Sequence, residues 1–258
     1  AHGTKTVARF LADRAAEETE ALVFRGEVGP TRRLSWGQLR SGAASVAAAL
    51  RADGVGPGDR VAGFLPNLPE TVIAMLGAAS VGAVWSSCSP DFGVEGVVDR
   101  FGQIQPRVLF VADGYRYGGK EIDSLATARL LLNELPSVER LVVVPFLGSG
   151  GDLPERSCLW EDYCAPHVGT QPEYTRLPFG HPLFIMFSSG TTGIKRGVLV
   201  TDREFELIDQ RAGLLDEGLL RLRNDHVVLA EADSGLERVA EAEAHDRVGK
   251  ETVSFWPV

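Results

Sequence analysis

The sequence predicts an α/β protein in which βαβ units form a parallel sheet covered by helices on both faces. Two observations favour this fold class. Apolar runs of five to seven residues recur along the middle of the chain, and amphipathic stretches of about a dozen residues separate them. Buried parallel strands are typically continuous apolar runs, and each crossover between two of them usually contains a helix.

The chain is expected to begin with a helix over residues 7–18 and a β-hairpin. In the hairpin, the strand ALVFRGE pairs with TRRLSW across the turn VGP. Residues 35–59 predict a helix, because apolar residues recur there at helical spacing and Gly54 stands where a C-terminal cap is expected. These apolar residues are Leu39, Ala43, Val46, Ala47 and Leu50.

The alternation of strands and helices follows this helix. The predicted strands are residues 60–65, 83–89, 107–113 and 140–146. The predicted crossover helices are residues 69–82, 93–104 and 121–135. A looser connection rich in Gly, Pro and polar residues is expected over 147–181, and it leads into a buried strand, PLFIMF.

The loop SSGTTG follows the carboxyl end of that strand, and GVLVT is expected to form the next strand. In open α/β sheets, ligands bind outside the carboxyl ends of the strands. The remaining residues, 202–258, are predicted to form an acidic and mostly helical tail. It contains a broken helix over 202–225, a short strand HVVLA and a helix over 234–248.

Composition and charge limit the classes of partner. A net charge of −9 disfavours a nucleic-acid partner, and residues 202–258 carry most of it, with 14 acidic and 7 basic residues. No apolar run approaches the roughly 20 residues of a membrane span, and no secretory signal opens the sequence. The three cysteines, Cys88, Cys158 and Cys164, lack disulfide-framework or metal-ligand spacing. We therefore expect a cytoplasmic protein with small-molecule substrates.

The loop after PLFIMF is the candidate site. Its glycines allow close backbone approach, its hydroxyls and N–H groups can bind an anion, and two cations follow. The candidate phosphate-binding residues are Ser188, Ser189, Gly190, Thr191, Thr192, Gly193, Lys195 and Arg196. The spacing does not match the loop of P-loop NTPases. A turn or linker is the alternative, but the apolar strands on both sides favour a phosphate site.

The segment SSGTTGIKRG resembles the signature loop of the adenylate-forming superfamily, which includes acyl-CoA synthetases, luciferases and adenylation domains. SSCSPDFG, DRFGQIQP and DGYRYGGK are similar to the acetoacetate-specific branch, and the resemblance covers roughly residues 20–200. It implies that residues 1–201 are the N-terminal portion of an AMP-dependent synthetase/ligase domain, an incomplete copy of that fold. It also implies ATP, Mg2+ and CoA as cofactors and substrates.

Departures from the family pattern point to an impaired ligase. Lys195 and Arg196 replace the usual Pro-Lys pair, and Asp202 stands where a His is usual, which would repel polyphosphate. The adenine-binding segment, the magnesium-binding Glu and the catalytic Lys of the family have no counterpart in residues 202–258, where Lys250 is the one lysine. No residue is therefore assigned a catalytic or metal-binding role.

Other residues have a structural interpretation. Tyr115, Tyr117 and the glycines after them read as a surface turn, Asp99 and Arg100 as an exposed helix pair, and His181 as a structural residue.

Three hypotheses for function stay open. The first is a synthetase-derived chain of acetoacetate–CoA ligase type, inactive or weak alone. The second is a non-catalytic nucleotide- or partner-binding module, whose apolar surface would be covered by self-association or by binding to a separately encoded remainder. The third places an independent activity in residues 202–258.

Overall fold

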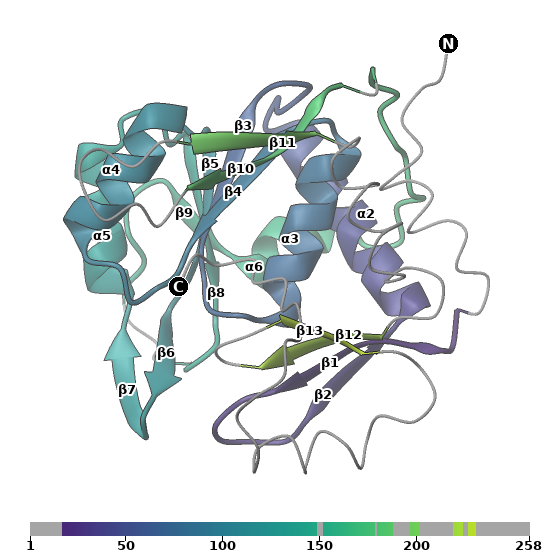
Figure 1. The fold of residues 1–258 in the computed structure, drawn as a ribbon, viewed down its shortest axis with the longest axis horizontal. Helices are drawn as coiled ribbons and strands as arrows, with labels where there is room; N and C mark the ends of the chain where they lie inside the picture. The colour runs from purple at the N-terminus through teal and green to yellow at the C-terminus, as the bar shows by residue number, and fades with distance from the viewer. Residues whose placement is uncertain are drawn as a thin grey trace, which may run out of the picture.

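The computed structural model describes residues 17–148, 152–178, 180–187, 197–201, 219–223 and 227–230. A seven-stranded sheet forms its centre, in the order β11-β10-β4-β3-β5-β8-β9 (Figure 1). All neighbours in this sheet are parallel except the pair β10–β11, which is antiparallel. The strands are β3 (Arg60–Phe64), β4 (Val84–Cys88), β5 (Val108–Ala112), β8 (Arg140–Val144), β9 (Ser157–Leu159), β10 (Pro182–Phe187) and β11 (Gly197–Thr201). The predicted α/β class with parallel βαβ units is confirmed.

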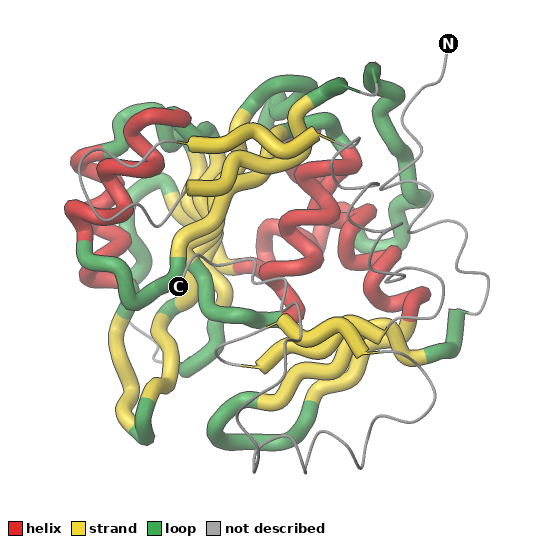
Figure 2. Tube along the Cα trace, in the orientation of Figure 1, coloured by secondary structure: helices red, strands yellow, loops and turns green. Residues whose placement is uncertain are grey.

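Helices cover both faces of this sheet (Figure 2). On one face lie α2 (Trp36–Ala52), α3 (Pro69–Ser80) and the short α6 (Trp160–Cys164). On the other lie α4 (Val94–Ile104) and α5 (Leu125–Glu134). Alternation along the strands sends side chains to the two faces in turn, so two apolar cores form. Within β3, for example, Val61 belongs to the first core, and Ala62 and Phe64 to the second.

Local sequence explains how α2 begins and ends. The Ser35 hydroxyl accepts from the Gln38 N–H, and the Gln38 side chain accepts from the Ser35 N–H, a capping box. Gly54, with φ +74°, follows the helix in the left-handed conformation that glycine favours. Gly77 in α3 lets the two helices pack closely, because a Cβ there would lie 2.6 Å from Val46 Cγ1.

A second, four-stranded sheet has the order β13-β12-β1-β2. The predicted hairpin is confirmed as β1 (Glu20–Arg25) and β2 (Arg32–Ser35), which pair antiparallel. β12 (Leu219–Arg223) pairs with β1 in parallel, and β13 (Val227–Ala230) pairs with β12 antiparallel. The strand predicted at HVVLA is thus present, whereas β12 falls where a broken helix was predicted, so that prediction is wrong for residues 219–223.

Two further predictions need correction. β6 (Gly114–Tyr117) and β7 (Lys120–Asp123) form an antiparallel hairpin, so the helix predicted from 121 begins only at Leu125. The predicted loose connection contains β9, α6 and a 3-10 turn over Ala165–His167. The elements missed in both places are three to five residues long, too short to show a clear hydrophobic period in the sequence. The helices predicted over 7–18 and 234–248 lie mainly or entirely outside the described residues.

Arginines line the end of the main sheet at which its parallel strands begin, which we call the amino edge. Arg60 starts β3, Arg107 immediately precedes β5, and Arg140 starts β8. Arg60 donates to the carbonyls of Ile104 and Gln105 at 2.6 and 3.0 Å, at the C-terminal end of α4. These carbonyls lack partners within the helix, so Arg60 caps it.

Arg107 and Arg140 join the same edge to acidic residues. Arg107 holds Glu139 through two hydrogen bonds of 3.0 and 2.8 Å, and Asp59 through one of 3.1 Å. Arg140 lies 3.3 Å from Asp53. Each of these arginines thus has at least one acceptor within the chain, although the buried Nε of Arg140 has none among the described residues. Among the described residues, no helix is long and apolar enough to cross a membrane.

Candidate functional site

The candidate site lies at the opposite end of the sheet, which we call the carboxyl edge. β4 and β10 are parallel neighbours, with Phe184 opposite Trp85, so their last residues, Cys88 and Phe187, lie at the same edge. β11 returns antiparallel to β10, with Gly197 opposite Phe187. The Ser/Thr/Gly loop thus joins two adjacent strands at the edge where open α/β sheets bind ligands.

The predicted phosphate-binding residues themselves lie outside the described residues. They are Ser188, Ser189, Gly190, Thr191, Thr192, Gly193, Lys195 and Arg196. Their role stays a prediction from sequence. Its structural basis is the position of the two strands that flank them.

Polar contacts fix β10 beside β4. The Ser86 hydroxyl donates to the Ile185 carbonyl at 2.8 Å. His181, just before β10, places Nε2 2.8 Å from the Gly82 carbonyl oxygen, which agrees with its structural interpretation. Gly63 in β3 makes room for the Trp85 ring, because a Cβ at residue 63 would lie 2.7 Å from Trp85 Cζ2. The strand that leads into the loop therefore has a defined place.

Arg100 is the functional candidate that sequence reasoning missed. It was predicted to be exposed, and this is wrong, because only 6% of the residue is exposed. Its Nη1 donates to the Gly96 carbonyl at 2.6 Å, and its guanidinium carbon lies 4.3 Å from the centre of the Phe92 ring. Position 100 falls at helical spacing from Val97 and Ile104, both buried, and this spacing was the available signal.

Burial governs the chemistry of the cysteine at this edge. Burial raises the pKa of the Cys88 thiol to about 12, and the positive charge of Arg100 acts in the opposite direction. Cys158 and Cys164 also have raised pKa values, chiefly from burial. All three are free thiols. The raised pKa of each thiol disfavours its thiolate form at neutral pH.

The β6–β7 hairpin corresponds to the surface turn predicted at Tyr115 and Tyr117. The N–H groups of Gly118 and Gly119 donate to the two carboxylate oxygens of Glu27 at 2.9 and 3.0 Å. Both glycines have positive φ, so their N–H groups point the same way. This contact joins the hairpin to the loop between β1 and β2.

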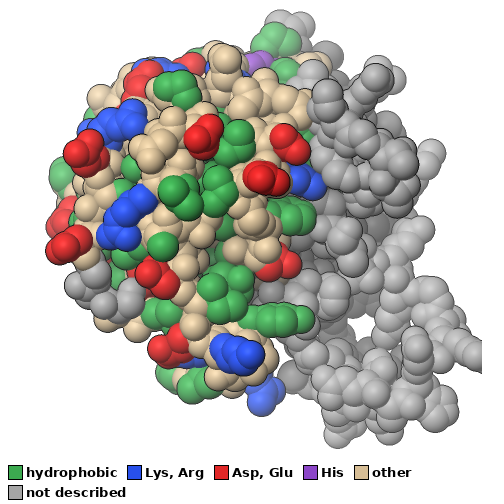
Figure 3. Space-filling model, turned by 90° about the vertical axis from the view of Figure 1, so that its left-hand side faces the viewer, with side chains coloured by type: hydrophobic (Ala, Val, Ile, Leu, Met, Phe, Trp, Pro, Cys, Tyr) green, Lys and Arg blue, Asp and Glu red, His purple; other side chains and the backbone are tan. Residues whose placement is uncertain are grey.

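The described residues contain no group of three or more His, Cys, Asp or Glu side chains that could hold a metal ion. Figure 3 shows the face over α4 and α5, where acidic and basic side chains are scattered among apolar ones. The described residues of that face form no large patch of a single charge.

The parallel sheet, and the two strands that flank the Ser/Thr/Gly loop at its carboxyl edge, have the architecture of an open α/β domain that binds ligands at that edge. A family model described as "AMP-binding enzyme" matches residues 11–231, and the chain belongs to this family.

Its relatives include acetoacetyl-CoA synthetases. The chain is 47% identical over 183 residues to the acetoacetyl-coenzyme A synthetase of Rhizobium meliloti (strain 1021), covering 70% of this chain and 28% of the relative. It is 46% identical over 199 residues to that of Rattus norvegicus, covering 72% and 27%. The solved acetoacetyl-CoA synthetase from Streptomyces lividans superposes with a TM-score of 0.75 at 41% identity, covering 82% of this chain and 32% of that chain.

The chain spans about a quarter to a third of the length of these relatives. The chain belongs to the acyl-CoA ligase family. Because it spans only part of these relatives, the activity of the complete enzymes is not assigned to it here.

Proposed function

We propose that this chain supplies the phosphate-binding part of an acyl-CoA ligase of the acetoacetate–CoA ligase type. The observation that carries the proposal is the 47% identity to an acetoacetyl-coenzyme A synthetase, and the position of β10 and β11, the strands that flank the Ser/Thr/Gly loop, supports it. The proposal assigns residues 1–201 to the ligase domain and gives residues 202–258 no role. It places the chain in the cytoplasm, as the sequence predicts.

The reaction of such a ligase has two steps. The carboxylate of acetoacetate, or of another short acyl acid, attacks the α-phosphorus of ATP and releases pyrophosphate. The CoA thiol then attacks the acyl carbon and releases AMP. In the proposal, the hydroxyls and N–H groups of residues 188–193 bind the polyphosphate, and Lys195 and Arg196 offset its charge.

Magnesium would offset the charge of the phosphates in this reaction. Because the described residues offer no cluster of metal ligands, we assign the ion no protein ligand here. The chain's own contribution is to bind and orient the phosphates from the carboxyl edge.

The departures at Lys195, Arg196 and Asp202 favour weak adenylation by this chain. The second candidate, a nucleotide-binding module without catalysis, is motivated by the same three residues. Both candidates predict binding of ATP, and they differ in turnover.

Acetoacetate-dependent exchange between ATP and labelled pyrophosphate tests the proposal on the purified, folded chain with Mg2+. Weak exchange that disappears without acetoacetate supports a ligase. ATP binding by calorimetry without any exchange supports the binding module. Absence of both binding and exchange would contradict the phosphate-site assignment itself.

A further inference from the structure

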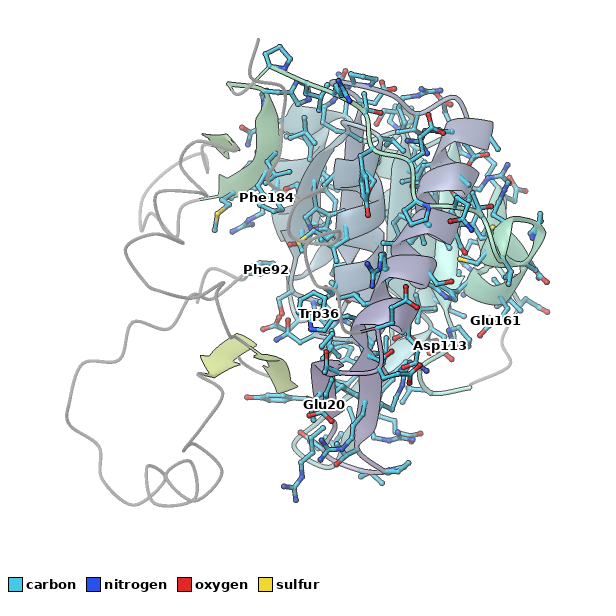
Figure 4. The ribbon with its side chains drawn as sticks, turned by 90° about the vertical axis from the view of Figure 1, so that its right-hand side faces the viewer. Glu20, Trp36, Phe92, Asp113, Glu161 and Phe184 are labelled. Atoms are coloured by element: carbon cyan, nitrogen blue, oxygen red, sulfur yellow. The ribbon has the colours of Figure 1, made fainter. Side chains whose placement is uncertain are left out.

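Arg100 lies near the carboxyl edge of the sheet, the edge at which β4 ends and the chain continues into α4. It belongs to α4, and its side chain extends back to the first turn of that helix, at Gly96. Cys88 and Phe187, the last residues of β4 and β10, share one apolar core with Val97 of the same helix, and Phe92 packs against that core. Phe92 is labelled in Figure 4, on the side of the molecule where β10 and β11 lie.

The described contacts of the Arg100 side chain account for few of its donors. Nη1 has one acceptor, the Gly96 carbonyl, and the Phe92 ring covers one face of the guanidinium. Nε is buried and has no acceptor among the residues that the structure describes. Within the described part of the chain, no carboxylate lies within ion-pair distance of Arg100. The neighbouring acids Asp91, Glu95 and Asp99 are exposed.

A guanidinium is always charged, and a buried charge is costly unless it is paired and hydrogen-bonded. At the other end of the same helix, Arg60 has an acceptor for each of its three nitrogens, at 2.6, 3.2 and 3.0 Å. The two arginines therefore differ in kind. Arg60 is satisfied by α4 and the turn before β3, whereas Arg100 retains charge and a donor for another group.

We propose that Arg100 is an oxyanion-binding residue whose ligand is the polyphosphate of the nucleotide held at the carboxyl edge. This inference rests on the proposed function, because it takes the phosphate site to lie beside β4 and β10. The helix contributes as well, since the amino end of α4 carries partial positive charge. Arginine suits this role because its planar fork can donate two parallel hydrogen bonds to a phosphate.

Two variants and a matched control test the inference in the full chain. Arg100→Met removes the charge and keeps an apolar side chain of similar reach, and Arg100→Lys restores the charge without the fork. The control, Arg60→Met, removes the arginine of β3 that caps the opposite end of α4. Calorimetry measures the affinity of each for inorganic tripolyphosphate, for ATP and for acetoacetate, and thermal unfolding without ligand reports stability.

We expect Arg100→Met to weaken binding of tripolyphosphate and of ATP at least tenfold, and Arg100→Lys to recover part of the loss. Arg60→Met should lower the unfolding midpoint and leave both affinities within twofold of the wild type. Equal affinity for tripolyphosphate in the wild type and Arg100→Met would overturn the inference and leave the proposed function standing.

Two other outcomes also overturn it. Loss of acetoacetate binding alone would assign Arg100 to the acyl carboxylate. A large fall in the unfolding midpoint of Arg100→Met with unchanged affinities would mean that its counterion belongs to the chain. If the wild type itself binds neither ATP nor tripolyphosphate, the proposed phosphate site fails, and the inference fails with it.

Discussion

Buried and half-buried arginines have different hydrogen-bond and ion-pair partners at the amino and carboxyl edges of the main sheet. At the amino edge, Arg60, Arg107 and Arg140 meet helix carbonyls and carboxylates of the same chain. At the carboxyl edge, Arg100 is more deeply buried than any of them, yet Gly96 is its one described hydrogen-bond partner. The Nε of Arg140 also lacks an acceptor among the described residues, so the difference between the edges lies in the carboxylates: Arg107 and Arg140 each pair with one, whereas Arg100 pairs with none in the described part of the chain.

The difference follows from what a parallel sheet leaves at each end. The amino edge receives the C-terminal ends of the crossover helices, whose carbonyls need donors, and arginines supply them. The carboxyl edge receives helix amino ends, which favour anions. A cation buried there adds to the positive potential, so it increases the attraction for an anionic ligand. The predictions below test this contrast, from the largest expected effect to the smallest.

Arg107→Met should cause the largest loss, about 2 kcal/mol of unfolding free energy, because it removes hydrogen bonds to two carboxylates and to the Gly54 carbonyl. Urea unfolding of the variant and the wild type measures the loss. Arg107→Lys serves as the control, since it keeps the charge but not the fork to Glu139. A loss below about 0.5 kcal/mol in Arg107→Met would mean that the amino edge does not depend on this arginine.

The stabilising effect of Arg107 should also depend on pH. The hydrogen bond from Arg107 lowers the pKa of Glu139 below its usual 4.5. A carboxyl whose folded-state pKa is lowered contributes stability that is present above its unfolded-state pKa and is lost as pH falls through the folded-state value. The difference in stability between wild type and Arg107→Met should therefore be constant near neutral pH and shrink below about pH 4.5. An unchanged difference at pH 3 would contradict this account.

The contrast between the edges was only partly readable from sequence. The apolar runs at β3, β4, β5 and β8 predicted the sheet, because a strand buried on both faces is apolar throughout. The hairpin over 114–123 was missed, because its alternating polar residues and paired glycines also suit a surface turn.

The candidate site, too, was only partly predictable from the sequence. The loop over 188–193 was readable as a motif, and its placement after a buried strand needed only the apolar run before it. Arg100 was misread because a charged residue beside Asp99 suggests a solvated helix face. Its position among Val97, Phe101 and Ile104 placed it on the apolar face, but sequence could not show that its Nε would be buried there without an acceptor among the described residues.

Tyr163→Phe tests how far the amino edge extends. The Tyr163 hydroxyl donates to Asp53 at 3.0 Å, and Asp53 also pairs with Arg140, so α6 joins the arginine network. Removing this hydroxyl should lower the unfolding free energy by about 1 kcal/mol, measured by urea unfolding. Tyr174→Phe is the control, because the buried Tyr174 hydroxyl has no hydrogen-bond partner within the described ranges, and its removal should cost less. Equal losses in the two variants would place Tyr163 outside the network.

Arg100→Met should have the smallest effect on the ligand-free chain, within about 1 kcal/mol of the wild type and of either sign. Loss of the contact with the Phe92 ring costs about as much as is regained when a buried and weakly paired charge is replaced by an apolar side chain. Urea unfolding without phosphate, compared with Arg107→Met under the same conditions, measures this. If Arg100→Met lost as much unfolding free energy as Arg107→Met, Arg100 would stabilise the fold as the arginines of the amino edge do, and the contrast between the edges would be wrong. Near-neutral stability would instead mean that the chain keeps a buried cation at the carboxyl edge without needing it to fold, as expected of a residue that serves a ligand.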